Sequence, residues 1–245
     1  MPGVCRGLHR RAGAAWVGQN KGTSEQQKAR HGSRRAGRWP VQLRFACELT
    51  GGEYVTQRAW RRASLPRCPL HPKGGCGFAR HGTYGRVTPP GTRVARWYCR
   101  RGHRTFSLLP DCLAAHLSGT LSEVEAVVRA VEQAAGLEAA CQELRPDIEL
   151  PGVLRWARRR VQAVQSALHV LKGLWPERFA CAPTLLAFAA CLGVAEVLLA
   201  LRPIAEPVLQ QLPSPLGLRP RRQPGGGRGR ARQHHAGPDP PRRAA

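Results

Sequence analysis

The feature that most restricts how this chain can fold is a group of cysteines and histidines on both sides of one predicted β-hairpin. In chain order they are Cys68, His71, Cys76, Cys99 and His103. A structural zinc site needs four nitrogen or sulfur ligands in a tetrahedron, and small β units provide them from two loops at the base of a hairpin. The spacing therefore predicts one zinc ion, with five candidate ligands for four positions.

The hairpin is predicted from two runs of extended-looking sequence. Residues 77–87 read GFARHGTYGRV and residues 92–99 read TRVARWYC, with β-branched and aromatic side chains in both. Between them, residues 88–91 read TPPG, which is a proline and glycine turn signal. Pairing of the two runs places a cysteine-containing loop at each base of the hairpin.

We favour one set of four ligands, namely Cys68, Cys76, Cys99 and His103. Gly77 follows Cys76, and glycine permits the tight turn that usually comes after the second ligand of such a loop. His71 is the alternative, and the sequence leaves open whether His71 or Cys76 is the ligand. A closed four-ligand site leaves no position for water, so its expected role is to fold the unit rather than to catalyse a reaction.

The cysteine usage points to a reducing compartment. Residues 1–20 contain no apolar run of the length that a secretory signal needs. In the cytoplasm, where we expect association with the nucleoid, clustered Cys and His indicate metal rather than disulfide bonds. The cysteines with apolar neighbours, expected in the core, are Cys112, Cys141, Cys181 and Cys191.

The charge of the chain indicates a polyanionic partner. Lys and Arg total 39 against 15 Asp and Glu, giving a formal net charge of +24, and no acid lies between Glu53 and Asp111. An acid-free window around the Cys and His cluster is typical of a surface that meets phosphate. DNA is the expected partner and RNA the alternative. The arginines of this window that we expect to contact nucleic acid are Arg80, Arg86, Arg93, Arg96, Arg100, Arg101 and Arg104.

The residues that follow the ribbon have a helical period. Thr120 and Glu123 fit a capping box, residues 137–144 form a short second helix, and Pro151 is placed for the first turn of a third. Three helices of which the last is basic predict a helix-turn-helix, whose third helix enters the major groove. Its expected DNA contacts are Arg155, Arg158, Arg159 and Gln162.

The predicted fold class is α+β, a small zinc ribbon followed by a mainly helical unit. The expected segments are 1–64 as a disordered basic extension, 65–112 as the ribbon, 118–175 as the helix-turn-helix unit, 176–212 as apolar helices at about 184–201 and 204–211, and 213–245 as a disordered tail.

One apolar segment has the length of a membrane span. Residues 179–201 contain Pro183 and Glu196, and a charge near the middle of a span is costly. We therefore expect a buried bundle helix and no membrane contact.

Residues 66–112 resemble the N-terminal zinc ribbon of bacterial insertion-sequence transposases and, more closely, an uncharacterised bacterial protein family. The similarity lies in CPLHPKGGCGFARHGTYGRV and RVARWYCRRGHRTFSLLPD. It implies that Cys68 and Cys76 form the first knuckle and that Cys99 begins the second, whose other ligand would stand at Gly102 here. In transposases such a ribbon, followed by a helix-turn-helix, engages DNA at the ends of the element, which implies a mobile-element accessory or regulator.

No catalytic core is expected. After Asp111 the chain has only two further aspartates and no strand–carboxylate pattern, P-loop or nucleophile elbow. We therefore expect DNA recognition without cleavage, and not an enzyme. Two alternatives stay open: a zinc-stabilised protein-interaction module that docks a partner through the ribbon and residues 184–211, and an RNA-binding protein that stacks bases on Tyr84, Trp97 or Tyr98.

Overall fold

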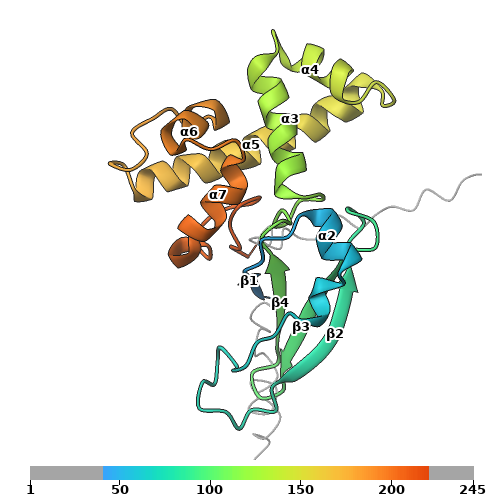
Figure 1. The fold of residues 1–245 in the computed structure, drawn as a ribbon, viewed down its shortest axis with the longest axis vertical. Helices are drawn as coiled ribbons and strands as arrows, with labels where there is room; N and C mark the ends of the chain where they lie inside the picture. Colours follow the sequence, from blue (N-terminus) through green and yellow to red (C-terminus); the bar gives the residue numbers. More distant parts are fainter. Residues whose placement is uncertain (1–40, 221–245) are drawn as a thin grey trace, which may run out of the picture. The chain divides into compact units, whose positions relative to one another are not determined.

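The computed structural model describes residues 41–220, and Figure 1 shows how their helices and strands are arranged. The expectations for residues 1–40 and 221–245 fall outside this range. The α+β class is confirmed. In chain order the elements, with η for a 3-10 turn, are β1 (Val41–Phe45), α2 (Gly51–Thr56), η1 (Ala59–Arg61), β2 (Ala79–Gly85), β3 (Arg93–Cys99), β4 (Arg104–Pro110), α3 (Leu121–Gln133), α4 (Leu137–Leu144), α5 (Leu150–Leu174), α6 (Leu185–Leu192), α7 (Val197–Ile204) and η2 (Glu206–Val208).

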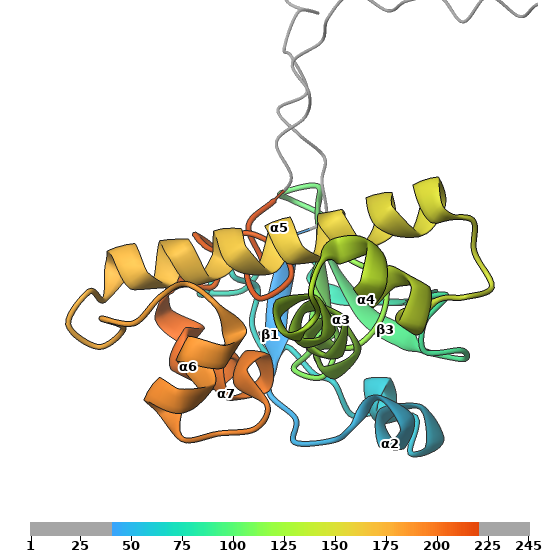
Figure 2. The ribbon, with the colours of Figure 1, turned by 90° about the horizontal axis from the view of Figure 1, so that it is seen from above.

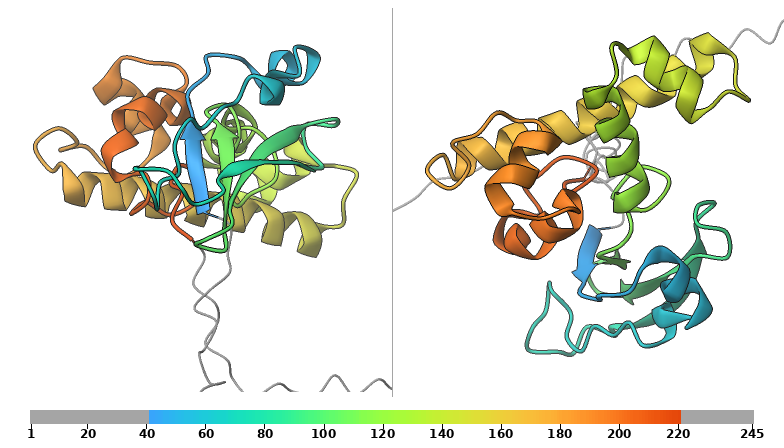
Figure 3. Two further views of the ribbon diagram at one scale, coloured as in Figure 1. Left: turned by 90° about the horizontal axis from the view of Figure 1, so that it is seen from below. Right: turned by 45° about the horizontal axis from the view of Figure 1, so that its top comes forward.

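The strands form one sheet in the order β1-β4-β3-β2. β2 and β3 are the predicted hairpin, and its turn is closed by a 3.2 Å hydrogen bond from the Thr92 N–H to the Pro89 carbonyl. β4 returns antiparallel to β3, and β1 lies parallel to β4 at the edge (Figure 3). Neither β1 nor β4 was expected from the sequence. In β1 apolar and polar residues alternate over only five positions, and in the buried second half of β4 they do not alternate.

Residues 41–64 fold against the sheet, which differs from the disorder expected for the whole of 1–64. α2 begins at a capping box, in which the Thr50 hydroxyl accepts a hydrogen bond from the Glu53 N–H. The Tyr54 side chain is buried, and its hydroxyl donates to the Arg93 carbonyl at 3.0 Å. These contacts tie α2 to β3, so this part of the basic extension belongs to the β unit.

The three predicted helices lie where the sequence places them. α3 begins at the Thr120–Glu123 capping box, α4 spans the expected residues, and α5 carries Pro151 in its first turn. α5 contacts both α3 and α4, as Figure 2 shows from above. Leu168 of α5 lies in the same hydrophobic core as Val94 of β3, so the boundary expected after residue 112 does not separate two cores.

The apolar C-terminal part differs from the single helix expected over 184–201. Gly193, with a φ of +66°, ends α6 in the left-handed conformation, and α7 continues at an angle of 64°. Among the described residues no single helix is long and apolar enough to cross a membrane. Only α6 and α7 taken together, bent at Gly193, reach the necessary length and apolar composition. Cys191, expected in the core, is exposed.

Residues 213–220 pack on the core, although the whole segment 213–245 was expected to be disordered. Leu216 and Leu218 are buried, and the Ala115 N–H donates to the Pro215 carbonyl at 2.8 Å. The leucines of this short segment bury apolar area that its composition as a whole did not indicate.

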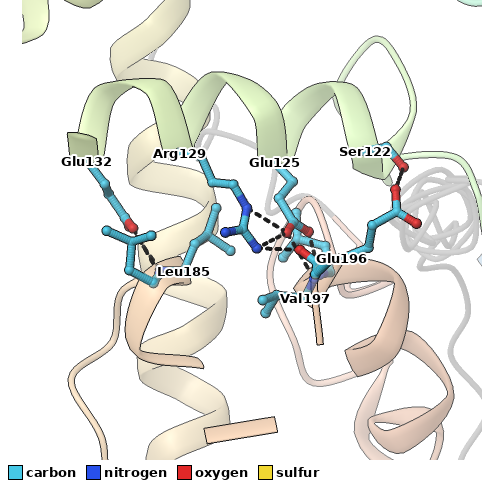
Figure 4. Close-up of polar contacts among 10 residues, drawn as sticks. Ser122, Glu125, Arg129, Glu132, Leu185, Glu196 and Val197 are labelled. Carbon is cyan, nitrogen blue, oxygen red and sulfur yellow. Dashed lines mark hydrogen bonds and ion pairs between the residues drawn. The ribbon is translucent and has the colours of Figure 1, made fainter. Parts of the chain in front are cut away.

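Two carboxylates of α3 cap the N-termini of the two C-terminal helices (Figure 4). Glu125 accepts hydrogen bonds from the first two N–H groups of α7 at 2.9 and 2.7 Å, and Glu132 accepts from the first two of α6 at 2.9 and 3.1 Å. Glu125 is 3% exposed and is also paired with Arg129 at 2.8 Å. Because unpaired helix N–H groups favour negative charge, these contacts fix α6 and α7 against α3.

Three arginines hold the loop between β4 and α3 by its carbonyl groups. Burial lowers the pKa of Arg202 to about 10, and it also lowers the pKa of Arg86 and of Arg160. A buried guanidinium needs acceptors, and an irregular loop supplies free carbonyls. The pairs are Arg202 with Leu113 at 2.7 Å, Arg86 with Ala114 at 2.9 Å, and Arg160 with Ser118 at 3.4 Å.

Replacing Glu125 with alanine should lower the free energy of unfolding by about 3 kcal/mol, because two buried N–H groups of α7 lose their acceptor. The matched change Glu132→Ala removes a half-buried cap and should cost about 1 kcal/mol. Urea unfolding followed by circular dichroism measures both. Equal losses for the two variants would contradict the role assigned to Glu125.

Candidate metal centre and basic surface

A group of four side chains that can hold a metal ion lies at the end of the sheet opposite α3. It consists of Cys68, His71, Cys76 and Cys99, whose ligand atoms all lie within 4.8 Å of one another. The first three come from the long loop before β2, and Cys99 comes from the end of β3 (Figure 1). The predicted sharing of one site by Cys68 and Cys99 is therefore seen, but the division is three ligands to one rather than two to two.

Hydrogen bonds within the two loops set the direction of the ligands. In the first loop the His71 N–H donates to the Cys68 carbonyl at 3.1 Å, and Gly77 after Cys76 has a φ of +63°, as the sequence indicated. In the turn between β3 and β4 the backbone N–H of Gly102 donates to Cys99 Sγ at 3.2 Å. A 3.2 Å bond from the Arg101 N–H to the Cys76 carbonyl joins the two loops.

His71, not the favoured His103, completes the group. His71 Nδ1 lies 3.3 Å from Cys99 Sγ and 3.6 Å from Cys68 Sγ. His103 is exposed with a φ of +46°, and its Nδ1 lies 3.1 Å from the Tyr98 hydroxyl oxygen. Both expected sets are thus corrected: His71 and Cys76, which the sequence left as alternatives, are both in the group, and His103 is outside it.

Gly102 lies beside the metal group. A Cβ built on Gly102 would lie 2.7 Å from Leu70 Cδ1, 3.3 Å from Cys99 Sγ and 3.5 Å from His71 Cε1, so a side chain at this position would displace Leu70 and adjoin the metal group. The resemblance to transposase ribbons places a ligand at this position, and here it is a glycine. The spacing Cys68-x2-His71 and the missing side chain at 102 are the two sequence signals that favour His71.

The donor set suits zinc. With Zn–S of about 2.3 Å and Zn–N of about 2.0 Å, a tetrahedron separates a nitrogen from a sulfur by roughly 3.5 Å, close to the 3.3 and 3.6 Å found for His71 Nδ1. The three cysteines are buried, and Phe106, Phe78 and Trp97 pack around them. Three thiolates, one imidazole and an apolar surround are typical of a structural zinc site rather than of a hard cation such as magnesium.

The thiols differ in pKa. Burial raises the pKa of Cys76 to about 11, and its hydrogen bonds to the sulfurs of Cys68 and Cys99 add to the rise. Burial also acts to raise the pKa of Cys68, but hydrogen bonds from His71 and from backbone N–H groups outweigh it and lower the value to about 7. Metal binds the thiolate, so binding must displace protons from this group and its affinity should rise with pH.

The arginines expected to contact nucleic acid divide into two groups. Arg80 donates to the carbonyls of Arg61 and Trp60 at 2.8 and 2.6 Å, and Arg86 holds the loop after β4. The Arg96 guanidinium lies over the Tyr84 ring. These side chains serve the fold, as does Arg104, which is half-buried. Arg80 is exposed even though its guanidinium is bonded to the backbone, and the other exposed members on the β unit are Arg93, Arg100 and Arg101.

The expected contacts on α5 are exposed. Arg155 donates from Nε to the Pro151 carbonyl at 3.1 Å. One turn later, Arg159 donates from Nε to the Arg155 carbonyl at 3.2 Å. Both guanidiniums thus lie along the helix surface. Arg158 and Gln162 are also exposed, whereas Arg160 is buried over the Trp156 ring.

A shallow groove of about 400 Å³ lies beside the metal loops. Its side chains include Phe78, Arg80, His81, Tyr98 and Arg100. The ring centroids of His81 and Tyr98 are 5.4 Å apart, so two rings and two guanidiniums line one surface. Aromatic faces next to cationic groups are the elements from which proteins build platforms for nucleic-acid bases.

Comparison of the chain with protein-family models, with curated proteins and with solved structures found no match. The resemblance of residues 66–112 to transposase ribbons therefore rests on their sequence alone.

Replacing His71 with alanine should lower the zinc content of the purified protein well below one equivalent, because it removes one of four ligands, while His103→Ala should keep it. The double variant His71→Ala/Gly102→Cys should recover zinc, since a Cβ at position 102 points at Cys99 Sγ. Inductively coupled plasma mass spectrometry measures the metal. Loss of zinc in His103→Ala but not in His71→Ala would contradict this ligand set.

Proposed function

We propose that the chain is a DNA-binding protein in which a structural zinc ion holds a small β unit rigid. The observation that carries the proposal is the charge at the metal end. Residues 54–110 contain no acid, and four exposed basic side chains of this stretch, Arg67, Lys73, Arg100 and Arg101, lie on the metal loops. The other exposed basic side chains are Arg58, Arg61, Arg62, Arg80 and Arg93, of which Arg93 lies at the end of β3 away from Cys99. A single-sign surface of this kind is attracted to a phosphate backbone.

The zinc ion would act through position rather than through chemistry. Arg100 and Arg101 directly follow Cys99, and the Arg101 backbone is bonded to the loop that contains Cys76. Zinc bound to Cys76 and Cys99 would therefore fix two cationic side chains that project from the β3–β4 turn. Phosphate contacts gain from such rigidity because less side-chain and loop entropy is lost on binding.

The basic stripe on α5 is the proposed second contact. Arg155, Arg158 and Arg159 are exposed, and the preceding helix α4 packs against α5. In a helix-turn-helix the second helix of the pair enters the major groove, so we propose that α5 does so here. The loop between α4 and α5 contains Arg145–Glu149, which is longer than a tight three-residue turn.

Three carboxylates, one directly after β4 and two on α3, are committed to structural contacts. Asp111 is held by Arg44 at 2.8 Å, and Glu125 and Glu132 cap helices. Side chains committed to such contacts are poorly placed to bind the two metal ions of a transposase core. We propose that the protein binds DNA as an accessory or regulator of a mobile element, in the cytoplasm at the nucleoid. This role is consistent with the resemblance to transposase ribbons.

A second candidate function is binding of single-stranded RNA, which the groove favours. Tyr98 and His81 offer ring faces next to Arg100, an arrangement that stacks bases of any sequence. Competition separates the candidates. RNA binding is favoured if single-stranded RNA displaces bound duplex DNA at a lower concentration than unlabelled duplex DNA of equal length does. Tyr98→Ala should then abolish this preference for RNA.

Replacing Arg100 and Arg101 with glutamine should weaken binding of the zinc-loaded protein to duplex DNA. The slope of log affinity against log salt should fall by about two, because each phosphate contact releases about one counterion. Fluorescence anisotropy at several salt concentrations measures both quantities. The matched control Arg178→Gln/Arg219→Gln removes the same charge from exposed positions outside the β unit, and an equal effect there would mean that only net charge matters.

Replacing Arg155 and Arg159 with glutamine should also reduce the salt slope by about two and should lower discrimination between DNA sequences if α5 reads base edges. The same titrations, run on a specific and a scrambled duplex selected from a random pool, provide the test. Unchanged affinity and slope would remove α5 from the interface and leave the β unit as the DNA-binding part.

A further inference from the structure

Two cysteines outside the metal group lie side by side where β1 and β4 end. β1 pairs parallel to β4, with Phe45 opposite Pro110 as the last pair of the ladder. Cys47 and Cys112 each come two residues after these strand ends, and their thiols are in hydrogen-bonding contact. Neighbouring strands lie about 4.8 Å apart, a separation within the range of Cα distances that a disulfide spans. Figure 3 shows the two strands next to each other.

Both cysteines line a cavity of about 710 Å³ between α2, the start of α3 and α7. This volume is typical of a pocket for a small molecule. Cys47 is half-buried, so a molecule in the cavity can reach its sulfur, whereas Cys112 is 3% exposed. Both thiols thus line the cavity, but Cys47 is the more exposed of the two.

The surroundings of Cys47 favour its thiolate. A hydrogen bond from the Cys112 thiol is the largest effect on Cys47, and backbone N–H groups of Asp111 and Leu49 also donate to its sulfur. Together they outweigh burial and lower the pKa of Cys47 to about 7. The same contact and burial raise the pKa of Cys112. A thiolate with a protonated thiol beside it is the arrangement of an attacking and a resolving cysteine.

We propose that Cys47 and Cys112 form a thiol–disulfide exchange site, in which Cys47 attacks a small disulfide that enters the cavity and Cys112 resolves the product. The proposal does not depend on the binding of nucleic acid. It rests on the β1–β4 register, on the cavity and on the contact between the two thiols.

The reaction balances with a disulfide RSSR as the oxidant. The Cys47 thiolate attacks one sulfur of RSSR, a Cys47–S–S–R bond forms, and RS⁻ leaves and takes a proton from water. Cys112 then loses its proton to water, and its thiolate attacks Cys47 Sγ and expels the second RS⁻. The two cysteines lose two electrons in total, and RSSR becomes two RSH.

The charge of the cavity selects the kind of disulfide. Its acidic side chains outnumber the single arginine in its lining, and that arginine, Arg44, is already paired with Asp111 and Glu206. The acids of the lining are Glu48, Asp111, Glu123 and Glu196. A cationic disulfide such as cystamine is therefore favoured over the anionic disulfide of glutathione.

A Cys47–Cys112 disulfide would also affect stability, because the chain between the two cysteines forms most of the β unit. The chain from Cys47 to Cys112 contains β2, β3, β4 and every ligand of the metal group. A crosslink between the ends of this segment restricts its unfolded state. Oxidised protein should therefore hold the β unit more firmly than the reduced protein.

The test uses the full-length, zinc-loaded protein treated with cystamine, blocked with N-ethylmaleimide and mapped by peptide mass spectrometry. Cys47 and Cys112 should be found joined in most molecules. The exposed Cys191 contacts Cys181, so the reference is Cys191 in a Cys181→Ser background, where it has lost that partner and should form only a mixed disulfide with cysteamine. Recovery of Cys47 and Cys112 as separately blocked thiols, under conditions that modify Cys191, would overturn the proposal.

Variants of Cys112 test the assigned roles. In Cys112→Ser and Cys112→Ala the product should stop at the mixed disulfide on Cys47. The pH midpoint of Cys47 alkylation should lie near 7 in the native protein and in Cys112→Ser, which keeps a donor, but should rise by about one unit or more in Cys112→Ala. Equal midpoints in the Ser and Ala variants would remove Cys112 as the donor to Cys47.

The entry route has its own readout. Relative to Cys191 in the same sample, Cys47 should react at least several times faster with cystamine than with glutathione disulfide. An equal or reversed preference would overturn the acidic cavity as the path to Cys47.

Discussion

The convergence of Cys68, His71 and Cys76 on Cys99 is the constraint on which the β unit depends. The loop that contains the first three ligands has no helix or strand of its own between η1 and β2. A small group of apolar side chains that includes Phe106 packs around the sulfurs. Because ordering a long loop costs conformational entropy, coordination of one ion by these four groups would add stabilising free energy to this small cluster.

The arginines of this chain serve two purposes that total charge does not separate. Arg202, Arg86 and Arg160 are partly or wholly buried and donate to carbonyls of the loop after β4. Arg100 and Arg101 are exposed on a turn. The first group joins the sheet to the helices, and only the second kind is available to a phosphate. A part of the formal charge of +24 is thus structural.

The acidic residues make the cationic surface possible by where they lie. Glu125 and Glu132 satisfy the N-termini of α7 and α6, and Asp111 neutralises Arg44 at the junction of β1 and β4. These roles keep negative charge in the helical part and at the junction of β1 and β4. The strands and loops at the metal end therefore present one sign of charge, without an acid to repel a phosphate backbone.

The sequence by itself determined the hairpin with its TPPG turn, the starts of α3 and α5, the extent of α4, and the meeting of Cys68 and Cys99, because turn residues, caps and helical period are local signals. Tertiary structure decided what those signals do not contain. β1 forms because β4 offers a partner, and residues 216–218 are buried because the loop at Ala115 receives them. The presence of His71 rather than His103 beside Cys99 is decided only once the loop before β2 packs against the β3–β4 turn. In the same way Cys47 and Cys112 become neighbours only through a parallel pairing of strands far apart in the chain.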